Sequence, residues 1–150
     1  MQETKERKPK KVFVDGPIAA AFIGDSIAKH QTKTDIGAHD IFLGQVRADV
    51  IEGKQVVAID YSAYEEMADK AFFEIREEAF ARHKLTCMHI YHSLGRVNAG
   101  EICLFVFVSA PHRQAAFEAT REIVEAIKAR VPIFGKEVFA DGEHVWKVNN

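Results

Sequence analysis

Three basic side chains surround a proline near the end of the chain, in residues 128–136. Pro132 stops a helix there, and an apolar extended segment follows it. A lysine partly desolvated in such a place has a lowered pKa, so Lys128, with Arg130 and Lys136 nearby, could hold an anion or pass a proton at neutral pH. The alternative is a helix whose last turn carries cations because they favour the negative end of the dipole. The segment alone leaves both interpretations open.

A second anion site is indicated where a predicted strand joins a helix, at residues 109–113. Ser109 is a candidate helix cap, Pro111 suits the first turn, and the free N–H groups of that turn attract anions. Arg113 would add a bidentate donor and His112 a further donor. An ordinary cap with a solvated arginine is the alternative.

Arg47 is a third candidate for contact with an anion. It ends an apolar strand in which Gly44 lets a ligand or another backbone come close. A surface position at the mouth of a hairpin is the alternative.

The histidines and cysteines do not predict a metal site. His89 and His92 lie three apart on a predicted strand, so their side chains point to opposite faces. His30 and the other histidines have no partner at ligand spacing. Cys87 and Cys103 stand alone in predicted strands and are interpreted as small buried residues without a disulfide. Nucleophile-elbow and phosphate-loop motifs do not occur either, which leaves a cationic pocket for an anion.

The positions of apolar residues predict the elements that hold these side chains. Helical spacing predicts a first helix from Pro17 to about residue 29, a second over 65–83, and a third that Pro132 ends. Alternating or continuous apolar runs predict strands at 12–14, 41–46, 56–64, 85–92, 102–109, 137–139 and 144–148. The strands at 41–46 and 56–64 are expected to pair as a hairpin, and Asp141-Gly142 predicts another. This order predicts an α+β fold, a mainly antiparallel sheet with helices packed on one face and a C-terminal β-hairpin.

Length and charge limit the classes of function. The 150 residues, 47% of them hydrophobic, suit one domain over 12–150, after a basic tail at 1–11 that we expect to be disordered. Without the five basic and two acidic residues of the tail, 15 basic and 20 acidic residues are left. Such a body predicts no binding of nucleic acid. No apolar run reaches the ~20 residues of a membrane span, and no secretory signal is evident, so a cytoplasmic protein is expected.

Five short motifs occur in the order and spacing of one protein family. They are Phe42-Leu43-Gly44-Gln45-Val46-Arg47, Tyr64-x-x-Met67, His92-x-x-Gly95, Ser109-Ala110-Pro111-His112-Arg113 and Lys128-x-x-Val131-Pro132-Ile133-Phe134. On these residues the chain resembles the large, catalytic subunit of molybdopterin synthase, from about residue 12 to residue 148.

The resemblance implies a sulfurtransferase of molybdenum cofactor biosynthesis. Such an enzyme converts cyclic pyranopterin monophosphate into molybdopterin by installing the dithiolene sulfurs. The resemblance also implies that the sulfur arrives as a thiocarboxylate on the C-terminal glycine of a small ubiquitin-like subunit. A homodimer of large subunits with one small subunit at each end, a heterotetramer, is expected. No metal and no organic cofactor are implied.

The resemblance also assigns roles to residues. Lys128 matches the catalytic lysine beside the thiocarboxylate, and the substrate-binding residues are Arg47, His112 and Arg113. The family often places a second lysine at the position of Gly135, whereas here the lysine comes next, at Lys136. Either the backbone returns Lys136 to the same space as a second catalytic residue, or Lys136 lies at the surface. In the second case the chain could be a non-catalytic module that binds the ubiquitin-like sulfur carrier. A generic phosphometabolite-binding domain is the third alternative.

Overall fold

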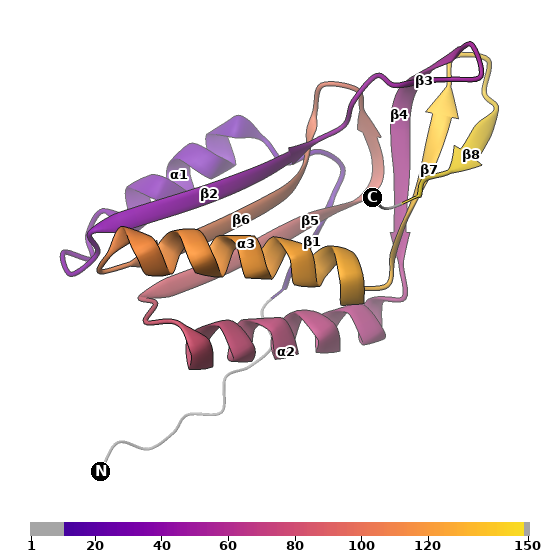
Figure 1. The fold of residues 1–150 in the computed structure, drawn as a ribbon. Coiled ribbons are helices and arrows are strands. Elements are labelled where there is room, and N and C mark those ends of the chain that lie inside the picture. Colours follow the sequence, from indigo (N-terminus) through magenta and orange to yellow (C-terminus); the bar gives the residue numbers. More distant parts are fainter. Residues whose placement is uncertain (1–10, 149–150) are drawn as a thin grey trace.

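The computed structural model describes residues 11–148, and its elements follow the predicted order (Figure 1). Apart from Lys11, the basic tail lies outside the described residues. The elements are β1 (Phe13–Asp15), α1 (Ala20–His30), β2 (Ala38–Gln45), β3 (Val50–Ile51), β4 (Lys54–Ala63), α2 (Glu65–Arg82), β5 (Cys87–Asn98), β6 (Ile102–Ala110), α3 (Arg113–Arg130), β7 (Ile133–Phe139) and β8 (His144–Trp146). The α+β class and the C-terminal hairpin are confirmed.

Within the described residues the strands form one eight-stranded, mainly antiparallel sheet with the central order β2-β6-β5-β4-β7-β8. β1 adds to β5 in parallel, and β3 adds to β4. The expected hairpin between 41–46 and 56–64 is wrong, because β2 pairs with β6. The turn at Glu52-Gly53 joins the short β3 to β4 instead. Pairing partners far apart in the sequence thus decide where β2 lies.

The expectation that the helices share one face of the sheet holds for α2 and α3 but not for α1 (Figure 1). Strand β6 explains the difference, since its apolar run is buried on both faces. Leu104, Val106 and Val108 belong to the core beneath α2 and α3. Phe105 and Phe107 point the other way and pack with the residues of α1.

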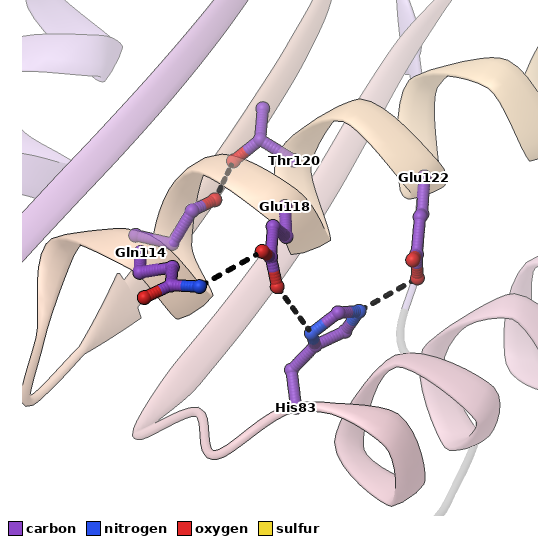
Figure 2. A network of polar contacts seen from close by, with 6 residues as sticks. His83, Gln114, Glu118, Thr120 and Glu122 are labelled. Atoms are coloured by element: carbon purple, nitrogen blue, oxygen red, sulfur yellow. Dashed lines mark hydrogen bonds and ion pairs between the residues drawn. The ribbon is translucent and has the colours of Figure 1, made fainter.

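Polar contacts link α3 to α2 and to the residue that follows α2, and Figure 2 shows those around His83. His83, which follows α2, contacts Glu122 of α3 over 2.6 Å through Nε2, and its Nδ1 lies 4.0 Å from Glu118. At the other end of the pair, Arg130 forms ion pairs with Glu74 and Glu78 of α2. The cation of Arg130 is therefore engaged with α2, near the end of α3 where Lys128 lies.

The C-terminal hairpin places side chains on alternate faces of the sheet. In the rows that cross the sheet, Lys136 is opposite Asp60 of β4 and Trp146 of β8. One residue along, Gly135 is opposite Tyr61, and the Lys147 N–H donates a 2.7 Å hydrogen bond to the Gly135 carbonyl. Because neighbouring rows point to opposite faces, Lys136 and Gly135 face opposite sides of the sheet.

Candidate active site

A small cavity lies where the end of α3 meets the sheet. Its walls include Tyr61, His92, Lys128, Val131, Gly135 and Lys147. Three of these positions come from one row across β4, β7 and the end of the hairpin, and Lys128 reaches the cavity from the last turn of α3. The cavity combines two lysines with apolar and aromatic walls, a combination suited to an anionic group.

Lys128 occupies the place that the sequence predicts, beside Val131 and the strand after Pro132. The residue is exposed in the single chain, yet the protein around its ammonium desolvates it enough to lower its pKa. Cys103 partly opposes this effect, and the positive charge of Lys147 adds to it. A lysine with a lowered pKa can both hold an anion and exchange a proton more readily than an ordinary lysine.

His92 forms a buried wall of the cavity, with only 3% of its surface exposed. Burial is the main reason that its pKa falls to about 4, and the charge of Lys128 contributes to the fall. Its Nδ1 lies 2.8 Å from the Ser93 carbonyl, so Nδ1 carries the proton of the neutral ring and donates to that oxygen. The Tyr61 ring packs edge-on against the imidazole, with 5.1 Å between centroids.

Three further residues near the cavity were not predicted from the sequence. Burial raises the pKa of Tyr61, and Cys103 and Glu137 reinforce the effect, so its hydroxyl stays protonated. Glu137 is buried, and its Oε2 has no hydrogen-bond partner among residues 11–148. Cys103 is a buried free thiol, as expected, but the expectation did not place it near Lys128. Their strand positions alone gave no signal, because the cavity forms only when β4, β6 and β7 lie together.

The structure does not bring Lys136 into this cavity. Its ammonium lies 5.2 Å from the centre of the Trp146 ring. On that face of the sheet, away from the cavity, Arg96 lowers the pKa of Asp60 and the charge of Lys136 adds to the effect. Gly135 therefore does not redirect Lys136 toward Lys128. A catalytic role for Lys136 stays a prediction.

Arg47, His112 and Arg113 lie at other places in the fold. Arg47 follows β2 and contacts Asp49 over 3.3 Å. Arg113 is the first residue of α3 and His112 its N-cap, whereas Lys128 is 15 residues further along, about 22 Å at the helical rise. Within one chain, therefore, the start of α3 and the Lys128 cavity are separate sites.

The predicted helix cap at Ser109 is wrong. Ser109 lies in β6, where its buried hydroxyl is 2.7 Å from Nδ1 of His39. His112 takes the cap position, without a side-chain cap hydrogen bond, and Pro111 precedes the helix. The hollow beside the first turn of α3 is lined by Arg113 and also by Glu118, whose negative charge opposes an anion there.

On the far face of the sheet, three possible metal ligands come together that the sequence did not predict to meet. Ligand atoms of His30, Cys87 and His89 lie within 4.8 Å of one another. The two Nε2 atoms of the histidines are 2.9 Å apart, and Lys33 donates a 2.8 Å hydrogen bond to the Cys87 sulfur. His30 thus has a partner 59 residues away, contrary to expectation. The prediction that His89 and His92 point to opposite faces is confirmed, since His89 meets His30 of α1 whereas His92 lines the cavity at the end of α3.

None of the helices in the described part of the chain is both long and apolar enough to cross a bilayer.

The comparisons with known proteins identify the family. The family model described as MoaE protein matches residues 18–130, about three quarters of the chain. The chain belongs to the MoaE family. Among curated relatives, the molybdopterin synthase catalytic subunit of Oryza sativa subsp. japonica is 47% identical over 113 residues, covering 75% of this chain and 58% of the rice protein. That of Pyrococcus abyssi is 41% identical and covers 75% of each chain. The chain thus spans under two thirds of the rice relative.

Solved structures show the same fold. Molybdopterin synthase from Staphylococcus aureus superposes with a TM-score of 0.77 at 29% identity, over 91% of this chain and 96% of that one. A complex of subunits 1 and 2 of molybdopterin-converting factor from Helicobacter pylori gives a TM-score of 0.76 at 18% identity, over 90% and 88%. At that identity the second likeness shows the fold alone. The MoaE family match ends at residue 130, so the cavity residues of β7 and the end of the hairpin lie beyond it.

Proposed function

We propose that this MoaE-family chain is the large subunit of a molybdopterin synthase, a sulfurtransferase. It would take sulfur from the C-terminal thiocarboxylate of a small ubiquitin-like subunit and transfer it to cyclic pyranopterin monophosphate. The observation that carries the proposal is the Lys128 cavity, where an ammonium with a lowered pKa meets a second lysine between apolar walls. The names of the curated relatives support the same reaction.

The chemistry of the reaction matches this cavity. A bond from the sulfur to a carbon of the pterin side chain forms, and a carbon–oxygen bond of that carbon breaks so that its oxygen leaves. Water then adds to the glycine carbonyl carbon, the bond from that carbon to sulfur breaks, and the carrier is left with a carboxylate. Negative charge develops on the glycine oxygen during the transfer, and a fixed ammonium stabilises such charge most strongly where water is scarce. Lys128 is placed for that role. At neutral pH both His92 and Tyr61 are uncharged, so neither side chain repels the anion or binds it in place of Lys128.

The proposal includes the partners. The carrier's extended tail would enter the cavity, and a second copy of this chain would form the homodimer at the centre of a heterotetramer. Because Arg113 lies about 22 Å along α3 from Lys128, it could serve the same substrate only if a second copy brought its own α3 start to this cavity. Arg47, His112 and Arg113 keep their proposed role in binding the phosphate or the tail. A cytoplasmic location is part of the proposal.

An in vitro conversion assay tests the function. Purified thiocarboxylated small subunit and cyclic pyranopterin monophosphate are supplied to wild type and to Lys128→Ala. Lys29→Ala, at an exposed lysine of α1, is the control, and Lys136→Ala tests the catalytic role predicted for that residue. We expect product from wild type and a large loss in Lys128→Ala, with the fold retained by circular dichroism. Binding of the small subunit without any product from wild type would favour the non-catalytic module instead. Failure to bind the small subunit would favour a phosphometabolite-binding domain.

A further inference from the structure

The cavity at the end of α3 contains two lysines from different elements. Lys128 comes from the helix, and Lys147 comes from the segment just after β8. Lys147 is half-buried and carries a positive charge close enough to act on Lys128. Neither the five sequence motifs nor the family match, which ends at residue 130, includes Lys147.

Backbone pairing fixes the position of Lys147. Its N–H donates to the Gly135 carbonyl over 2.7 Å, which continues the antiparallel ladder between β7 and β8 by one row. Gly135 is itself opposite Tyr61. Residues directly opposite one another in a sheet point to the same face, so Tyr61, Gly135 and Lys147 form one row on the side of the cavity.

Gly135 leaves the middle of this row without a side chain. A Cβ atom added there would lie 3.6 Å from the Cβ of Lys147, 3.5 Å from the Tyr61 ring and 3.0 Å from Cγ2 of Ile59, the last a tight contact. The side chain of Lys147 thus begins in van der Waals contact with the space that a residue at 135 would occupy. Lys136 is excluded from that space, because it belongs to the neighbouring row and lies against Trp146.

We propose that Lys147 supplies the second ammonium of the cavity, in the space that Gly135 leaves open, and that it binds the anionic C-terminal end of the carrier together with Lys128. This inference rests on the proposed function for the identity of the anion. Two ammonium groups on opposite walls would hold the two terminal atoms of a carboxylate or thiocarboxylate, one from each side. In this arrangement Gly135 has no side chain in the row, and Lys147 at the end of the hairpin provides the ammonium there instead.

Variants of Lys147 test the proposal in the conversion assay. Lys147→Met keeps the stem and removes the charge, and it should lower kcat/KM for the small subunit by about tenfold or more, the usual loss for a charge-assisted hydrogen bond. Lys29→Met, at an exposed lysine of α1, is the matched control and should stay within about twofold. Adding Gly135→Lys to Lys147→Met should restore part of the loss, because the new ammonium starts from the same row, although its Cβ lies only 3.0 Å from Cγ2 of Ile59. A Lys147→Met enzyme as active as wild type, beside an inactive Lys128→Ala, would overturn the inference and leave the proposed function intact.

A second measurement does not depend on turnover. In the protein with 13C-dimethylated lysines, NMR titration gives the pKa of Lys128 directly. Lys147→Met should raise that pKa, because a neighbouring positive charge is removed, whereas Lys29→Met in α1 should leave it unchanged. An unchanged pKa in Lys147→Met would show that the two ammonium groups do not share the cavity. If wild type makes no product but Lys147→Met raises the pKa of Lys128, the proposed function fails while the shared cavity stands.

In the same samples, a peptide ending in Gly-Gly carboxylate should bind more weakly to Lys147→Met than to wild type. The peptide amide should bind both proteins equally weakly. Equal carboxylate binding to both proteins would count against the proposal.

Discussion

Lowering the pH from 7 to 5 is expected to destabilise the fold through His92. The unfolded chain has a histidine pKa of 6.5, whereas burial and Lys128 hold the pKa of His92 in the folded chain at about 4. Between these values the unfolded chain binds a proton that the folded chain does not, so stability falls as the pH falls. The free energy of unfolding should drop by about 2 kcal/mol between pH 7 and pH 5, and by about 3 kcal/mol at pH 4. Above pH 7 both states are neutral at this residue and the contribution vanishes.

Urea unfolding at a series of pH values measures this effect. Burial also lowers the pKa of His39, which acts in the same direction, so the quantity of interest is the difference between wild type and His92→Gln. The variant should lose stability at pH 7 through poorer packing, yet show a shallower decline toward pH 4. His144→Gln controls for the loss of an exposed histidine. Parallel curves for wild type and His92→Gln would refute the claim that the fold keeps this imidazole neutral.

Three further changes test the packing. Gly37→Ala would place a Cβ atom 2.2 Å from the Pro111 carbonyl oxygen, and it should lower the free energy of unfolding by about 1–3 kcal/mol in chemical denaturation. Gly24→Ala in α1 is the control and should not destabilise the protein, because a Cβ atom there would have nothing within 4 Å. Phe107→Ala leaves a cavity in the cluster beneath α1 and should lower the free energy of unfolding by about 3–5 kcal/mol. The amides of α1 should then lose protection in hydrogen exchange. Arg130→Ala removes exposed ion pairs to α2 and should cost under about 1 kcal/mol, less at high salt; a larger loss would mean that these pairs hold the end of α3 more firmly than their exposure implies.

The sequence predicts those parts of the fold that depend on local patterns. Apolar residues at helical spacing gave a helix over 65–83, and α2 runs from Glu65 to Arg82. Pro132 marks the end of α3 because proline cannot continue a helix, and the position of Lys128 follows from it. The turn at Asp141-Gly142 is also local, with Gly142 at a φ of 88°.

Features that depend on distant pairing could not be predicted in this way. β2 pairs with β6 rather than with β4, and only the assembled sheet decides between these partners. His30 meets His89 because α1 packs across β5 and β6, which no spacing along the chain reveals. The register of the C-terminal hairpin places Lys147 opposite Gly135 and would have predicted its position. That register depends on the number of residues in the turn, which the sequence pattern alone does not define.

A structure of the chain bound to its small ubiquitin-like subunit tests the central claim most directly. We predict that the carrier's last glycine lies in the cavity at the end of α3, with its terminal atoms within about 3 Å of the ammonium groups of Lys128 and Lys147. A tail bound elsewhere, with Lys128 facing solvent, would contradict the account.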